Sequence, residues 1–504
     1  MDNCEKKYIL GFDMGTSGVK CIALDTVSGA YNTVYTQWDL RSPIHGYAEF
    51  DCDELWQCIV ASVCKLRDEH GVDLSMVASI GFCALCPGLI PLDEHGRELY
   101  NCIIFMDTRS GRETAEINSR ISPKESFDIL ANRIMSGATS VTSILWLKNN
   151  CREIYEKTAA FVHLPGWAGY KLTGKLCMDL SNAAGTGLYD IHRQCWSEKL
   201  ADAAGIDLKK LPKLAQGADL LGGVQCEEFI KLGIPAGTPV SCGAGDTVCA
   251  LLALFGRKSG GTMLMLGTSN VLFTISDNDS FSDKLQGRSF VFGDQWALGG
   301  AMSGPGAMQK WFKNKFCPDC VKIEHETGIS AYSIIDAEAA ATPPGADGLI
   351  CLPYINGERS PVYDSNARAV LLGVNLNTTR GHVARAITEG AAYGIRQFID
   401  LLYECTGSKP KELSVLGGGS RSNFVVQTMA NVTGCVMNTF DNPDLGALGA
   451  AITGGLAGGV IDESYTAPCI VKLKTFTPDT SLSEVYKSGF KRYCKIYPAV
   501  KDIF

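Results

Sequence analysis

The chain lacks the features that would assign it to a membrane or to nucleic acid. None of its apolar runs approaches the ~20 residues that a bilayer-spanning helix needs. Its formal net charge of −8 at pH 7 provides no basic surface for nucleic acid or for an anionic membrane. Its seven histidines are scattered, so no histidine-based metal site is expected. The first residues lead directly into a strand-like segment at 9–14 rather than into the apolar region of a signal peptide, which indicates a cytoplasmic location.

Cysteine, in contrast, is abundant, with 21 residues. Most lie in apolar segments, where a thiol packs as a small hydrophobic group. A long chain without a secretory signal also indicates a reducing compartment, so disulfides are not expected. Two CxxC spacings, Cys83–Cys86 and Cys317–Cys320, leave a four-thiolate zinc site as an alternative. Buried thiols are the favoured interpretation, because the first pair lies in a strand-like run and the pairs belong to opposite halves.

The tripeptide Gly-Thr-Ser occurs twice, at 15–17 and at 267–269, which is 252 positions apart in a chain of 504 residues. Each copy interrupts an apolar, strand-like run. A small, hydroxyl-bearing turn between two strands exposes backbone N–H groups that suit phosphate oxygens. Either copy alone is explained by the turn preferences of these residues. Their repetition at half the chain length predicts two tips, one from each half, that grip a polyphosphate between them.

The length predicts two or three domains, because one hydrophobic core rarely serves so many residues. Each half opens with strands and then alternates helix and strand. Hydrophobic periodicity predicts helices at 53–67, 302–315 and 381–404, and strands at 33–38, 77–82, 289–292, 295–298 and 415–416. A Gly-rich polar stretch at 254–260 marks the boundary. We therefore expect two similar α/β domains, 1–254 and 255–504, each a mixed sheet flanked by helices, facing each other across a cleft.

Six motifs in order resemble the FGGY carbohydrate kinases, a family of the actin-like, ribonuclease H-like ATPase superfamily. The resemblance runs along the whole chain. It rests on residues 10–20 and 266–269 for two phosphate motifs, 243–246 for the catalytic base, 352–361 for a family loop, 417–427 for the adenosine side and 444–451 for the last helix. Within the family, 106–109 and 179–186 look most like the xylulose kinases. The resemblance implies two ribonuclease H-like domains with a nucleotide cleft between them.

The resemblance implies ATP and Mg²⁺ as cofactors and assigns the residues that would bind them. Asp13, at the end of the first strand, would hold Mg²⁺ through water, with an ordinary turn aspartate as the alternative. Phosphoryl transfer depends on positioning and charge neutralisation. The residues implied on the ATP side are Gly15, Thr16, Ser17, Lys20, Gly267, Thr268, Ser269, Gly306, Lys310, Gly418, Gly419 and Asn423. For Lys20 the alternative is a solvated strand residue, and for Asn423 a helix cap.

Asp246 is the residue that the resemblance implies as general base, with Thr247 beside it in the substrate site. From the sequence alone, an N-cap is the better interpretation of an aspartate between Gly245 and an apolar helix, and the resemblance reverses this preference. The two roles are partly compatible. A helix N-terminus favours the ionised carboxylate, and a base must be ionised to accept a proton.

The acceptor side departs from the family at one point. Xylulose kinases carry Gly-Gln-Met-His-Gly where this chain has residues 84–88, so Cys86 stands in the place of Met and Pro87 in the place of His. Loss of that His removes a hydrogen-bond donor for a sugar hydroxyl, which can shift specificity strongly. Asp107 is expected as a polar wall of the sugar pocket, with a strand-end aspartate as the alternative.

Together these features predict an ATP-dependent kinase that phosphorylates a hydroxyl of a ketopentose, with xylulose first and gluconate or another polyol second. An actin-like or chaperone-like ATPase is the alternative from another class. The kinase is favoured because those relatives lack the Asp246 motif and the 352–361 loop as a pair. The expected partner is a small-molecule sugar, without nucleic acid or membrane, and a homodimer is considered as the assembly.

Overall fold

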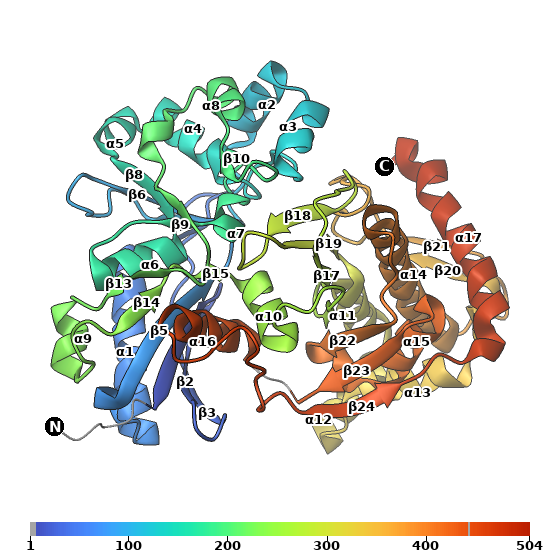
Figure 1. Ribbon diagram of the computed structural model, residues 1–504. Coiled ribbons are helices and arrows are strands. Elements are labelled where there is room, and N and C mark those ends of the chain that lie inside the picture. Colours follow the sequence, from blue (N-terminus) through green and yellow to red (C-terminus); the bar gives the residue numbers. More distant parts are fainter. Residues whose placement is uncertain (1–6, 442–443) are drawn as a thin grey trace.

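The structure is a computed structural model that describes residues 7–441 and 444–504. Two large mixed sheets dominate it, one in each half of the chain (Figure 1). In the first sheet the order is β13-β14-β5-β1-β2-β3, and β15 also pairs with β5. These strands are β1 (Tyr8–Met14), β2 (Gly18–Asp25), β3 (Tyr31–Gln37), β5 (Val77–Ala84), β13 (Leu220–Gly223), β14 (Pro239–Ser241) and β15 (Ala244–Gly245). β1 pairs antiparallel with β2 and parallel with β5.

Side chains alternate between the two faces of the first sheet, as a strand requires. Leu10 and Phe12 of β1 face the core formed with α1 (Cys52–His70) and α6 (Leu164–Thr173). Ile9 faces the opposite core. Both faces of the sheet are therefore covered, and α9 (Glu227–Leu232) packs beside α1.

A smaller lobe rises from the first half, seen at the top of Figure 1. It contains a four-stranded sheet in the order β4-β7-β6-β8 and a group of helices. The strands are β4 (Glu49–Phe50), β6 (Gly88–Leu92), β7 (Cys102–Ile104) and β8 (Ala160–His163). The helices are α2 (Gly111–Arg120), α3 (Pro123–Leu130), α4 (Ser140–Asn150), α5 (Arg152–Lys157) and α8 (Glu198–Ala204). Short pieces connect the lobe to the first sheet: β9 (Met178–Asp179), α7 (Leu180–Ala183), β10 (Tyr189–Asp190), β11 (Cys195–Trp196) and β12 (Leu214–Ala215).

The second sheet has the order β18-β19-β17-β16-β22-β23-β24. Its strands are β16 (Thr262–Leu266), β17 (Asn270–Ser276), β18 (Gln286–Ser289), β19 (Trp296–Met302), β22 (Glu412–Leu416), β23 (Val436–Phe440) and β24 (Lys472–Phe476). The long helix α14 (Arg380–Thr406) and α15 (Asn423–Thr433) bury its outer face, with α17 (Ser483–Val500) behind them. Beside them lie α11 (Pro305–Phe316), α12 (Pro318–Thr327), α13 (Ala331–Ala341) and the hairpin β20 (Ile350–Leu352) and β21 (Val370–Leu372).

Two helices, α10 (Asp246–Phe255) and α16 (Leu445–Ala457), pack on each other between the two sheets (Figure 1). Their contact is close, because a Cβ added to Gly449 would lie 2.0 Å from the carbonyl oxygen of Cys249. α16 follows the second sheet in sequence and nevertheless covers β1 and β5 of the first. Apolar side chains from both sheets join this interdomain core. The last helical motif of the chain is therefore a structural part of the first half.

The expected α/β architecture of two mixed sheets is confirmed, with two local differences. The strand predicted at 289–292 lies earlier, at Gln286–Ser289, because the apolar side chains of Phe290 and Val291 pack in the interdomain core instead of forming ladder pairs. The helix predicted from 302 begins at Pro305, a residue suited to the first turn, while Met302 still belongs to β19. Over 7–441 and 444–504, no helix is both long enough and apolar enough to cross a bilayer.

Candidate functional site

The two Gly-Thr-Ser segments form hairpin tips, as predicted. Gly15–Ser17 joins β1 to β2, and Gly267–Ser269 joins β16 to β17. The amide of Gly15 donates to the carbonyl of Gly18 (3.0 Å), and that of Gly267 donates to the carbonyl of Ser269 (3.1 Å). Small residues at such tips leave room for an anion to approach the backbone.

The N-terminus of α11 is held against the second tip. The amides of Gly306 and Ala307 donate to the carbonyl of Thr268, at 3.1 and 3.2 Å. Position 306 requires glycine, because a Cβ there would lie 2.0 Å from the carbonyl oxygen of Gly267. A helix N-terminus favours negative charge, so this junction combines two features that suit a phosphate.

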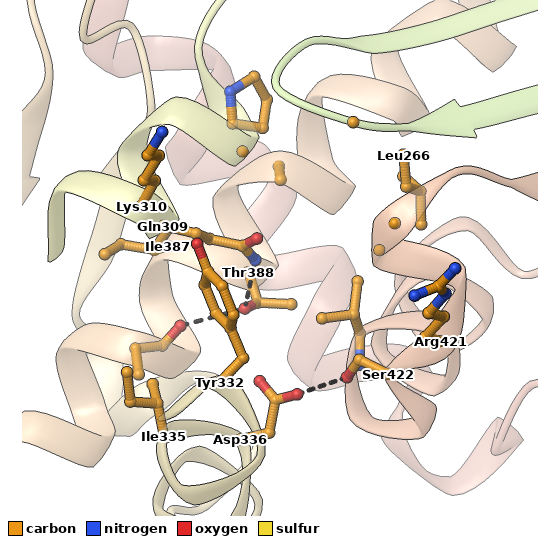
Figure 2. Close-up of a pocket in the computed structure, with 18 of the residues that line it drawn as sticks. Leu266, Gln309, Lys310, Tyr332, Ile335, Asp336, Ile387, Thr388, Arg421 and Ser422 are labelled. Carbon is orange, nitrogen blue, oxygen red and sulfur yellow. Dashed lines mark hydrogen bonds between the residues drawn. The ribbon is translucent and has the colours of Figure 1, made fainter. Parts of the chain in front are cut away.

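A cavity of about 650 Å³ opens beside the second tip, entirely within the second half of the chain (Figure 2). Six of the residues expected on the ATP side line it: Gly267, Thr268, Gly306, Lys310, Gly418 and Gly419. Tyr332, Ile335 and Ile387 add apolar surface, and Asp336 accepts a hydrogen bond from Ser422 (2.6 Å). A mainly apolar cavity with a few fixed polar groups is suited to a nucleobase and its ribose.

Ser269 and Asn423 are not among the residues that line this cavity. Ser269 donates to the carbonyl of Ser303 (3.4 Å), and the side-chain oxygen of Asn423 accepts from Lys474 (3.1 Å). Ser422, not Asn423, is the N-cap of α15. Sequence reasoning missed Tyr332 and Asp336, because they come from α13, which carries none of the recognised motifs.

Asp13 lies on β1 and Asp246 directly follows β15, and both strands pair with β5. Asp13 lies opposite Cys83 of β5, and Ala244 of β15 lies opposite the same cysteine. The carboxyl of Asp13 is buried, and burial together with the negative charge of Asp246 raises its pKa to about 6. Glycine is required beside it, since a Cβ on Gly446 of α16 would lie 2.4 Å from a carboxylate oxygen of Asp13.

Asp246 is the first helical residue of α10, and Gly245 is the N-cap. Its carboxylate accepts hydrogen bonds from the backbone N–H and the hydroxyl of Thr247, at 2.5 and 3.1 Å. Burial raises the pKa of Asp246, and the positive charge of Arg288 partly opposes that rise. The alternative that Asp246 serves as the N-cap is wrong, because another residue occupies that position.

A buried chain of polar side chains supports the backbone next to Asp246. Ser181 accepts from the amide of Gly245 (2.9 Å) and donates to Asp179 (2.5 Å). Asn182 also donates to Asp179 (2.7 Å) and lies 3.2 Å from the Nδ1 atom of His163. Burial lowers the pKa of His163 to about 4, so its ring is neutral at pH 7. Residues 179–186 therefore support the backbone before Asp246, a role that the sequence pattern alone did not reveal.

The remaining predicted residues lie in two other places. Lys20 forms an ion pair with Asp444 (2.9 Å) and is half exposed, near the first tip but engaged with a carboxylate. Cys86 lies close to the Asp246 backbone, because a Cβ on Gly245 would be 4.0 Å from the Cβ of Cys86. Burial raises the pKa of the Cys86 thiol to about 11. Pro87 follows it in the turn before β6.

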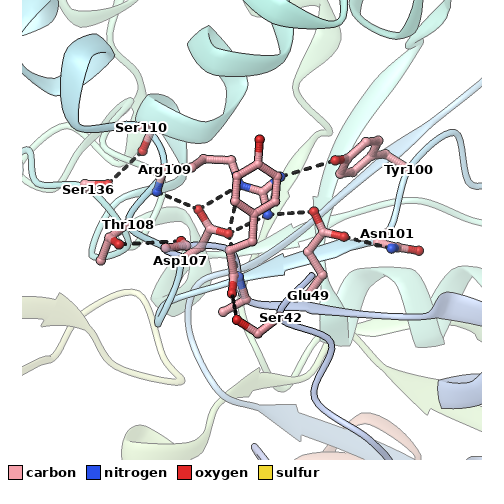
Figure 3. Close-up of polar contacts among 12 residues, drawn as sticks. Ser42, Glu49, Tyr100, Asn101, Asp107, Thr108, Arg109, Ser110 and Ser136 are labelled. Carbon is pink, nitrogen blue, oxygen red and sulfur yellow. Dashed lines mark hydrogen bonds and ion pairs between the residues drawn. The ribbon is translucent and has the colours of Figure 1, made fainter. Parts of the chain in front are cut away.

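Asp107 belongs to a buried ionic cluster in the small lobe (Figure 3). Its carboxylate accepts from the guanidinium of Arg109 and from the amide of Ala48 (2.7 Å). Arg109 also pairs with Glu49 (2.6 Å) and lies over the ring of Tyr47, 3.5 Å from its centroid. With both carboxylate oxygens engaged and the side chain buried, the structure gives Asp107 an internal partner rather than a place on a cavity wall.

The donor set fits Mg²⁺ better than zinc. Mg²⁺ in kinase sites is held by one or two carboxylates together with substrate phosphates, and Asp13 is a carboxylate of that kind next to the first hairpin tip. Among the residues that the structure describes, no three His, Cys, Asp or Glu side chains gather as a metal site. The CxxC alternative therefore has no support, and the described cysteines are free thiols.

Comparison with known proteins relates both halves of the chain to one family. The model of the FGGY family of carbohydrate kinases, N-terminal domain, matches residues 8–253, and that of its C-terminal domain matches 262–458. Xylulose kinase of Bacillus subtilis is 27% identical over 501 residues, covering 99% of this chain and 98% of that protein. Gluconokinase of the same bacterium is 26% identical over 459 residues, covering 90% and 88%. The crystal structure of ligand-bound xylulose kinase from Lactobacillus acidophilus superposes with a TM-score of 0.90 at 25% identity, covering 99% of each chain.

Proposed function

The chain belongs to the FGGY family of carbohydrate kinases, with the actin-like ATPase fold of that family, and on this premise we propose that it transfers the γ-phosphoryl group of ATP to a hydroxyl of a ketopentose. Xylulose is the first candidate acceptor, because several similar proteins are xylulose kinases. The observation that carries the proposal is that Asp13, beside the first hairpin tip, and Asp246, directly after β15, belong to strands that both pair with β5, and that the charge of Asp246 acts on Asp13.

In the proposed reaction Asp246 is the general base. The acceptor oxygen bonds to the γ-phosphorus as the bond to the bridging oxygen of ADP breaks, and the hydroxyl proton passes to the carboxylate of Asp246. Burial raises the pKa of this carboxyl toward the working pH, which suits a group that must take up a proton. The hydrogen bonds from Thr247 fix one carboxylate oxygen and leave the other for the hydroxyl.

The proposed nucleotide position spans both halves. The adenosine would occupy the cavity lined by Tyr332 and Gly418, and the phosphates would run between the two tips, where Thr16 and Thr268 donate to them. Asp13 would hold Mg²⁺ through water. When bound, Mg²⁺ neutralises phosphate charge, which phosphoryl transfer requires.

Gluconate, or another open-chain sugar acid or polyol, is the second candidate acceptor. Gluconokinases are similar to this chain at comparable identity. Pro87 also lacks the donor that the xylulose kinase motif provides at that position. A cytoplasmic location, a homodimeric assembly and a domain boundary at 254/255 complete the proposal.

The proposal is tested by measuring ADP release with ketoses, aldoses, polyols and sugar acids, each with and without Mg²⁺. We expect acceptor-dependent and Mg²⁺-dependent turnover that is greatest for a ketopentose or for a sugar acid. A chain that hydrolyses ATP at one rate, whatever acceptor is present, would contradict the assignment as a sugar kinase.

A further inference from the structure

The strand β18 carries a side chain of the second half to the acceptor side of the first. It is the edge strand of the second sheet, and Figure 1 shows it beside α7 of the first half. The edge of β18 that pairs with no strand of its own sheet contacts the first half instead, because the amide of Gly287 donates to the carbonyl of Ala131 (2.9 Å). On the other side of Arg288, the hydroxyl of Ser289 lies 3.0 Å from that of Tyr189. Arg288 is therefore anchored between two contacts that cross from one half to the other.

The positive charge of Arg288 acts on both Cys86 and Asp246. It opposes the rise in pKa that burial causes at each of these side chains. The geometry agrees, because a Cβ on Gly245, the residue before Asp246, would lie 4.0 Å from the Cβ of Cys86, and α7 touches both β15 and β18. Arg288 thus reaches the region where the proposed acceptor hydroxyl must meet the base.

One donor of the Arg288 guanidinium has no partner within the protein. Its Nε atom is buried and has no hydrogen-bond partner, and over 7–441 and 444–504 no carboxylate lies within 4.0 Å to pair with its charge. A guanidinium presents five N–H donors and no acceptor. A buried donor left unpaired lowers stability, and an oxygen of a bound acceptor would satisfy it.

We propose that Arg288 is a specificity-determining residue that donates a charge-assisted hydrogen bond to an oxygen of the acceptor. It would supply, from the second half of the chain, the donor that Pro87 cannot provide in the first. The recognised chemistry is an acceptor oxygen close to the phosphorylated hydroxyl, either a carboxylate of a sugar acid or a hydroxyl or carbonyl of a ketose. This inference rests on the proposed function and adds the residue that reads the acceptor.

The inference differs from a purely structural role in what it predicts for kinetics. An arginine that only held the halves together would, when lost, lower stability and affect ATP and acceptor alike. A residue that binds the acceptor changes the KM for acceptor and leaves the KM for ATP unchanged. A hydrogen bond to a charged group contributes ~1.5–3 kcal/mol, which corresponds to roughly 10- to 150-fold in kcat/KM.

The test compares Arg288→Gln and Arg288→Lys with the matched control Arg133→Gln. Arg133 also crosses between the halves, donating to the carbonyl of Asp283 (3.0 Å) and lying over the ring of Tyr363. We expect Arg288→Gln to lower kcat/KM for acceptor by about 10- to 150-fold with little change in melting temperature or KM for ATP. Arg288→Lys should recover part of the loss, and Arg133→Gln should leave the acceptor KM as it is. A larger loss for sugar acids than for ketoses would identify the carboxylate as the group bound.

A second readout separates the inference from the proposed function. Each acceptor is also tested for a rise in melting temperature in the presence of a non-hydrolysable ATP analogue. One outcome is an acceptor that stabilises the native chain without being phosphorylated and that does not stabilise Arg288→Gln. This outcome would refute the kinase reaction and support acceptor binding by Arg288. An active native enzyme with an unchanged acceptor KM in Arg288→Gln would overturn the inference alone. No turnover and no stabilisation by any acceptor would overturn both.

Discussion

Replacing Asp246 by Asn removes the proposed base while preserving its shape and one accepting oxygen. The Asn side chain can still accept the hydrogen bonds that Thr247 donates, so the start of α10 should keep its geometry. Since Gly245 occupies the N-cap, no capping energy is lost. Such a loss elsewhere typically costs ~0.5–2 kcal/mol. Local structure therefore gives no reason for Asp246→Asn to unfold.

The burial of Asp246 determines whether Asp246→Asn raises or lowers the stability of the fold. Burial raises the folded-state pKa of Asp246 above its ordinary value of 3.8, so ionisation is harder in the folded chain than in the unfolded one. The contribution of this group to stability is complete below pH 3.8 and is lost as the pH rises through the folded pKa. Asn carries no charge at any pH. At pH 8 the melting temperature of Asp246→Asn should therefore equal or exceed that of the native chain.

Asp246→Asn should lower turnover, by an amount that can be estimated from other general bases. A positioned general base contributes ~10²–10⁴-fold in rate, so acceptor phosphorylation should fall by at least about two orders of magnitude. ADP release measures turnover, titration calorimetry measures ATP affinity, and differential scanning fluorimetry measures the melting temperature. Asp51→Asn is the matched control, because Asp51 is a true N-cap whose side chain accepts from Glu54. If Asp246→Asn melts well below the native chain yet keeps its specific activity, the residue is structural and the base assignment is wrong.

Four further results are expected. Burial raises the pKa of Glu358 from its ordinary 4.5 to about 7, so the contribution of this group to stability is complete below about pH 4 and is lost as the pH rises through 7. Glu358→Gln should therefore raise the melting temperature at pH 8 and change it little at pH 4. A larger rise at pH 4 than at pH 8 would contradict this. Gly306→Ala should raise the KM for ATP and lower the melting temperature, since the new Cβ would lie 2.0 Å from the oxygen of Gly267; unchanged values of both would refute the tight junction. Arg109→Met leaves two buried carboxylates without their cation and should reduce the free energy of unfolding by about 3–5 kcal/mol in denaturant titrations, whereas a loss near zero would mean that the cluster is hydrated. Small-angle scattering should give a smaller radius of gyration with acceptor and an ATP analogue than without, and an unchanged radius would argue against closure of the two halves.

The fold was largely predictable because its strongest signals are local. Two Gly-Thr-Ser turns between apolar runs specify two hairpins, and the 3.6-residue periodicity of 53–67 and 381–404 specifies two helices. The path of α16 was not predictable in this way. Its small-residue pattern indicates close packing, but only the three-dimensional arrangement shows that its partners are β1 and β5, more than 350 positions earlier in the chain.

The site residues also divide into those with a local signal in the sequence and those without one. Backbone-dependent positions such as Gly267 and Gly306 could be predicted, because a tight turn or a close approach leaves a glycine in the sequence. The burial of Asp107 could not, since a strand-end aspartate looks the same whether it faces a cavity or an arginine. The place of Arg288 could not be predicted either, because it depends on an edge strand that lies against the other half of the chain.

The two halves are connected in a way that makes acceptor and nucleotide depend on each other. α16, which follows the second sheet in sequence, brings Gly446 against Asp13 of the first half. β18, also from the second half, brings Arg288 toward Cys86 of the first. A rotation of the second sheet against the first half would move the second hairpin tip on the phosphate side and Arg288 on the acceptor side at once. Because linkage is reciprocal, an acceptor that favours the closed arrangement must tighten ATP binding by the same factor by which ATP tightens acceptor binding. Titration of an ATP analogue with and without acceptor should give a ratio of dissociation constants above one, and a ratio of one would mean that the shared elements do not couple the two sites.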